Sequence, residues 1–61
     1  METIKQVLMR RDGMSENEAN ILIEEAREQL NDYLASGDLD YAEDICNEYF
    51  GLEPDYLDEL M

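Results

Sequence analysis

Acidic side chains are the residues of this chain whose spacing could do chemistry. They form two rows at intervals of four residues: Glu16, Glu24, Glu28 and Asp32, interrupted only by Asn20, and then Asp40, Asp44 and Glu48. Residues four apart are neighbours on a helix face, where a like-charged pair costs about 0.2 to 0.5 kcal/mol. Neither row uses a lysine to relieve that cost. The rows indicate acidic helix faces that bind a basic partner, or faces that only keep the protein soluble.

Catalysis and metal binding have little support in the sequence. The chain has no histidine and a single cysteine, Cys46, so the usual pairs of nucleophile and base are absent. Asp38-Leu39-Asp40 opens like a calcium-binding loop, but Ala42 and Glu43 stand where a ligand and the turn glycine are needed. A helix N-cap at Asp38 explains the same residues better. We therefore expect no enzyme, no metal and no cofactor.

Charge and composition narrow the class of protein. The chain has 61 residues and a formal net charge of −13, and no basic residue follows Arg27. Such a surface repels nucleic acid, so no direct nucleic-acid binding is expected. The hydrophobic content of 44% indicates a folded protein, which we expect to be one domain over residues 1–61. An unpaired cysteine, and the lack of a signal peptide or membrane-spanning run, favour the cytoplasm.

Glycine and proline divide the chain into helical segments. Ile4, Val7 and Leu8 recur at helical spacing and predict a first helix that ends near Asp12-Gly13. Ser15 and Glu18 match a capping box, which starts a long second helix that runs to about Ser36. A third helix is predicted over 39–50, and Pro54 begins a short fourth one. The expected fold is all-α: a compact three-helix domain with a long second helix plus a short C-terminal fourth helix.

The apolar spacing predicts which side chains form the core and which stay exposed. The expected core includes Ile4, Val7, Leu8, Ala19, Leu22, Ile23, Ala26, Leu30, Tyr33, Leu34, Leu39, Ala42, Cys46, Tyr49 and Phe50, with Ile45 at its margin. Two apolar residues fall outside these stripes, and an acidic binding surface needs such an anchor. The residues predicted to bind a partner protein are therefore Ile21, Asp40, Tyr41, Asp44 and Glu48.

The chain resembles two groups of proteins. One resemblance covers nearly the whole chain, and the other covers about a third of it. The opening 4–15, Glu18-Ala19, Glu24-Glu25-Ala26 and the later run 42–56 resemble small acidic helical proteins of bacteria and their phages or mobile elements. That resemblance implies no settled activity. The opening is also similar, more weakly, to the first two helices of ubiquitin-associated-like modules, such as the amino end of a translation elongation factor. The second helix here is much longer than in those modules, and the resemblance implies a binding module without site residues.

These observations predict a small noncatalytic cytoplasmic accessory protein that binds a partner through an acidic helical surface. The partner is expected to be a basic protein, and no membrane is involved. One alternative is a DNA mimic that inhibits a host nucleic-acid-binding or defence enzyme. Another is a structural homodimer without an electrostatic target, because small domains often gain stability by oligomerising.

Overall fold

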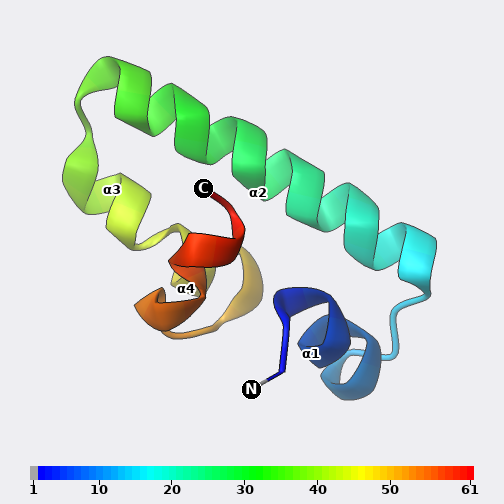
Figure 1. The fold of residues 1–61 in the computed structure, drawn as a ribbon. Helices are drawn as coiled ribbons and strands as arrows, with labels where there is room; N and C mark the ends of the chain where they lie inside the picture. Colours follow the sequence, from blue (N-terminus) through cyan, green and yellow to red (C-terminus); the bar gives the residue numbers. More distant parts are fainter. Residues whose placement is uncertain (1) are drawn as a thin grey trace.

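A computed structural model describes residues 2–61 and shows short helices packed along one side of one long helix (Figure 1). The elements are α1 (Ile4–Arg11), α2 (Glu16–Ser36), α3 (Leu39–Glu43), α4 (Ile45–Phe50) and a 3₁₀ helix, η1 (Pro54–Glu59). No strand occurs within residues 2–61, and the predicted all-α class is confirmed. The predicted layout of three helices plus a short fourth is not confirmed, because two short helices, α3 and α4, stand where one third helix was predicted.

Local sequence signals set the starts of α1 and α2. The Ser15 hydroxyl accepts a hydrogen bond from the Glu18 amide at 3.2 Å, and the Glu18 carboxylate accepts one from the Ser15 amide at 3.2 Å. This confirms the predicted capping box. Thr3 and Gln6 make the same pair of hydrogen bonds at the start of α1, where the prediction had only apolar spacing.

Gly37 ends α2, as predicted, and turns the chain sharply into α3. Its φ of 79° is the left-handed conformation that glycine adopts without strain. The Gly37 amide donates to the Leu34 carbonyl, and the Asp38 amide donates to the Tyr33 carbonyl at 2.9 Å, the two bonds of a Schellman motif. The predicted capping role of Asp38 is wrong in one respect. Its side chain makes no capping hydrogen bond, and its ψ of 66° is not the extended conformation that a capping side chain needs.

The helix predicted over 39–50 is divided at Asp44. The Asp44 amide donates to the Tyr41 carbonyl, three residues back, so the turn is tighter than α-helical there. The division comes with a different buried face. Ile45, predicted at the margin, is 0% exposed, whereas Leu39, predicted in the core, is 60% exposed.

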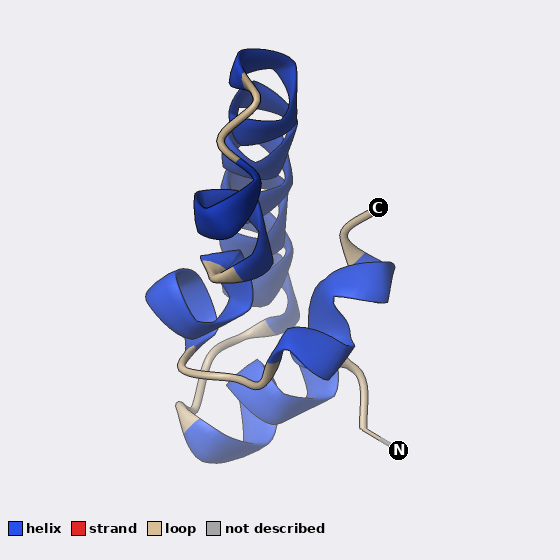
Figure 2. Ribbon diagram, turned by 90° about the vertical axis from the view of Figure 1, so that its left-hand side faces the viewer, coloured by secondary structure: helices blue, strands red, loops and turns tan. Residues whose placement is uncertain are grey.

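The core lies between α2 and the short helices, and it weakens toward the corner where α2 meets α3. Figure 2 shows this corner rising away from α1 and η1. Leu34, predicted in the core, is 42% exposed there, since α3 alone faces that end of α2. The buried apolar side chains come from α1, from α2 up to Leu30, from the C-terminal half of α3, from α4 and from the residue after η1: Ile4, Val7, Leu8, Ala19, Ala26, Leu30, Ala42, Ile45, Cys46, Phe50 and Leu60.

Side chains from distant parts of the sequence fasten the helix ends. The Glu59 carboxylate accepts a hydrogen bond from the Ile4 amide at 3.0 Å, which joins η1 to the first residue of α1. The Arg11 guanidinium donates to the Phe50 carbonyl at 2.6 Å, at the C-terminal end of α4. Both contacts place a charge where it suits the helix dipole. The described chain measures 33 × 20 × 15 Å.

Candidate protein-binding surface

The four basic side chains are all held in ion pairs, and all four lie in the first half of the chain. The pairs are Lys5–Glu16, Arg10–Glu2, Arg11–Asp12 and Arg27–Glu24. Two acids of the first predicted row, Glu16 and Glu24, therefore have a cation beside them, which the sequence rows did not suggest. The Lys5 hydrogen bond holds the pKa of the Glu16 carboxyl below its usual value. Within residues 2–61, no ion pair joins a basic side chain to an acid of α3, α4 or η1.

The second predicted row does not run along a single helix. Asp40 lies on α3, Asp44 in the turn between the helices, and Glu48 on α4. All three are exposed. The tightened turn alters the helical spacing between Asp40 and Asp44, whereas the Glu48 amide donates to the Asp44 carbonyl at 2.9 Å, so Asp44 and Glu48 keep the spacing at which like charges repel. The three acids still belong to one short segment of the surface.

An aromatic pair lies in the same region. The rings of Tyr33 on α2 and Tyr41 on α3 are stacked, with centroids 5.6 Å apart and planes inclined by 26°. Tyr33 is half-buried, whereas Tyr41 is 61% exposed, as predicted. Burial, followed by the nearby charge of Glu48, raises the pKa of the Tyr33 hydroxyl.

Leu39 completes this region, which we call the tyrosine surface. An open hollow of about 210 Å³ lies at the corner, and Leu39 and Tyr41 line it together with Gly37, Asp38 and Asp40. The tyrosine surface thus consists of Tyr33, Leu39 and Tyr41 with the acids Asp38, Asp40, Asp44 and Glu48. Sequence reasoning missed Tyr33 and Leu39 because it placed both in the core. The available signal was the pair of tyrosines on either side of the short Gly37 joint.

Ile21 is exposed, as predicted, but it does not belong to the tyrosine surface. Its side chain is 60% exposed. It precedes Tyr33 by twelve positions on α2, which corresponds to about 18 Å along the helix axis. The structure therefore brings together four of the five predicted partner-binding residues and leaves Ile21 in a second place.

Cys46 is 0% exposed, and burial raises the pKa of its thiol, with the charge of Glu59 adding to the effect. Within residues 2–61, no three His, Cys, Asp or Glu side chains form a group that could hold a metal ion. None of the helices in that range combines the length and apolar character needed to cross a bilayer. What the surface offers is charge, exposed aromatic area and a shallow hollow.

Comparisons with known proteins add no relative to this description. No family model matches the chain, and no curated protein or solved structure is significantly similar to it.

Proposed function

We propose that this protein is a small noncatalytic accessory protein of the cytoplasm, and that it binds a basic partner protein through the tyrosine surface. Its partner presents lysine or arginine side chains to Asp40, Asp44 and Glu48 and packs an aliphatic or guanidinium group on Tyr41. The protein makes no direct contact with nucleic acid or membrane. A source in bacteria, their phages or mobile elements is part of this proposal.

One observation carries the proposal: an exposed aromatic and apolar cluster lies among acids that form no ion pair within the described residues 2–61. Tyr41 and Leu39 are each about three-fifths exposed. A cation over a tyrosine face gains about 0.5 to 2 kcal/mol, depending on how far the site is desolvated. The surrounding acids raise the rate at which a basic partner is found and orient it, while the apolar contact supplies affinity. Either feature alone is common on protein surfaces.

A DNA mimic is the second candidate, and the length of the molecule favours it. Thirteen net charges over the longest dimension of 33 Å correspond to one per roughly 2.5 Å, against about one per 1.7 Å in duplex DNA. The partner would then be a nucleic-acid-binding or defence enzyme, and duplex DNA would compete for it. For the other basic partners, DNA would not compete.

The test is capture of proteins from an extract of the source cell by the immobilised chain. The test variant combines Asp40→Asn, Asp44→Asn and Glu48→Gln. The control variant combines Glu53→Gln, Asp55→Asn and Asp58→Asn, which changes net charge equally on and beside η1. We expect the test variant to lose the partner, and the control to retain it. Equal capture by both variants and the unchanged chain would contradict the proposal, and added duplex DNA separates its two forms.

A further inference from the structure

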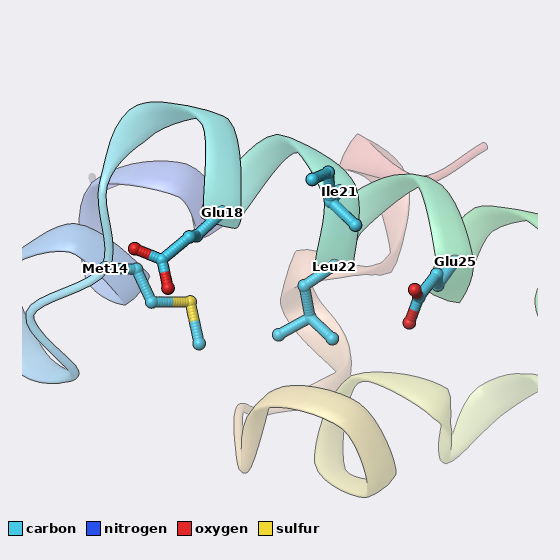
Figure 3. A pocket seen from close by; sticks show the side chains of 5 residues that line it. All are labelled: Met14, Glu18, Ile21, Leu22 and Glu25. Atoms are coloured by element: carbon cyan, nitrogen blue, oxygen red, sulfur yellow. The ribbon is translucent and has the colours of Figure 1, made fainter.

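A second hollow lies on the flank of α2, away from the tyrosine surface. It is open, has a volume of about 310 Å³ and is lined by Met14, Glu18, Ile21, Leu22 and Glu25. Figure 3 shows Glu18 and Glu25 one helical turn to either side of the pair Ile21 and Leu22, with Met14 across the hollow from Leu22. Met14 and Leu22 are partly buried against the core, while Ile21 stands 60% exposed at the edge.

The charges at this hollow indicate what could occupy it. Glu18 and Glu25 are seven residues apart, or about 10.5 Å along the helix. Within residues 2–61, the Glu18 carboxylate accepts one hydrogen bond, from the Ser15 amide, and the Glu25 carboxylate accepts no hydrogen bond. Neither has a cation beside it in that part of the chain. An apolar patch between two such glutamates is complementary to an apolar side chain between two cations.

A second copy of this chain fits the hollow poorly. If two α2 helices met antiparallel about Ile21 and Leu22, Glu18 of each would lie opposite Glu25 of the other. Like charges at close range are unfavourable, and each chain would also bring a net charge of −13. A basic partner removes both penalties. Charge therefore favours a foreign, cationic occupant over a homodimer.

We propose that this hollow is a docking site for a basic amphipathic helix, which inserts one aliphatic side chain between Met14 and Leu22, against Ile21 at the edge. Lysine or arginine residues seven positions apart on that helix, one turn before and after the aliphatic residue, pair with Glu18 and Glu25. The inference rests on the proposed function in taking a basic protein as the partner. It adds a second contact and specifies the form in which that partner presents its cations.

The experiment uses a synthetic helical peptide of about 18 residues, long enough to span the hollow. It contains leucines at helical spacing on one face and lysines elsewhere, and its affinity is measured by fluorescence anisotropy at about 0.15 M salt. A scrambled peptide of the same composition keeps the charge and loses the apolar face. We expect the unchanged protein to bind the amphipathic peptide at least about tenfold more tightly than the scrambled one, because burying one aliphatic side chain is worth that much.

Two matched pairs of variants locate the binding. Ile21→Ser and Met9→Ser each remove an exposed apolar side chain, 60% and 40% exposed, so neither should unfold the protein. Ile21→Ser should weaken the binding of the amphipathic peptide by about tenfold, and Met9→Ser, in a different hollow on α1, should leave it unchanged. Leu39→Ser reports on the tyrosine surface. Glu25→Gln should weaken it more than Asp55→Asn, although both change the net charge equally.

Several outcomes would overturn the inference. Equal affinity for the two peptides would show attraction by charge alone. Loss of binding in Leu39→Ser but not in Ile21→Ser would move the site to the tyrosine surface, and this would leave the proposed function standing. A dimer in sedimentation that Ile21→Ser abolishes would make a second copy the occupant. In the capture experiment, the Ile21→Ser variant could retain the partner while the variant with Asp40→Asn, Asp44→Asn and Glu48→Gln loses it. That result would likewise refute only the docking site at Ile21.

Discussion

Glu59 is the residue that joins the two ends of the described chain. Its carboxylate accepts the hydrogen bond of the Ile4 amide at the first turn of α1, where a negative charge suits the helix dipole. Glu59→Ala should lower the free energy of unfolding by about 1 kcal/mol, as for the loss of a helix cap. Urea denaturation measures this change in the free energy of unfolding. Asp58→Ala removes an equal charge from an exposed neighbour, so an equal loss in that control would show that the hydrogen bond has no role.

Cys46 should be chemically silent while the protein is folded. Its side chain is 0% exposed, so a reagent cannot reach the sulfur, and burial raises the pKa of the thiol, so little of the reactive thiolate forms. A domain of this size unfolds at a cost of a few kcal/mol, so labelling by a thiol reagent at pH 8 should be at least about 100-fold slower than in urea. The rate of absorbance change measures this. Labelling at the rate of the unfolded chain would show that Cys46 is open to solvent.

At the scale of elements, the turn between α2 and α3 depends on Gly37. A Cβ built there meets nothing within 4 Å, so Gly37→Ala is opposed only by the positive φ of 79°. Holding alanine in that conformation should lower the free energy of unfolding by about 1 kcal/mol. Gly37→Ala should therefore lower the urea midpoint by about 1 M for a small domain. Gly37→Asn should cost less, because asparagine tolerates this conformation better, and the opposite order would refute the explanation.

Elements with local signals were predictable from sequence, and those fixed by packing were not. The start of α2 follows from Ser15 and Glu18, which contact each other three residues apart. The break at Asp44 has no such signal, because each side of it reads as helix. It becomes visible only when Ile45 and Cys46 are seen buried under α2.

The predictability of the candidate site follows the same division. Tyr41 and Ile21 were placed at the surface because their angles fall outside the apolar stripes. Leu39 lies on the stripe, yet it is exposed because the core does not reach the α2–α3 corner. Helical spacing gives the direction of a side chain. It cannot say whether another element lies in that direction.

At the scale of the whole molecule, self-repulsion should make stability depend on salt. The net charge of −13 is carried by a folded molecule whose longest dimension is only 33 Å. Raising the salt from about 0.02 to 0.5 M shortens the screening length severalfold, so the urea midpoint should rise. Control variants with three acids neutralised, either in the tyrosine surface or around η1, should show a smaller rise. A midpoint that falls with salt would mean that the four ion pairs outweigh the repulsion.

The same balance gives a pH dependence with a maximum. From pH 7 toward the sequence isoelectric point near 4.1, protonation reduces the net charge, so stability should first rise. The carboxyls of Glu2, Asp12 and Glu16 act in the other direction. Hydrogen bonds from Arg10, Arg11 and Lys5 lower their pKa below the ordinary 4.5, 3.8 and 4.5.

A lowered pKa in the folded state means that the unfolded chain binds the proton first. The stability from these three carboxyls is therefore present above their ordinary pKa values and is lost as the pH falls through the folded ones. Because all three are exposed, their effect should be small and should appear only below about pH 4.5. Urea midpoints at low salt should thus be highest between pH 7 and about 4.5. A midpoint that falls steadily from pH 7 downward would show that repulsion among the acids does not limit the stability of this fold.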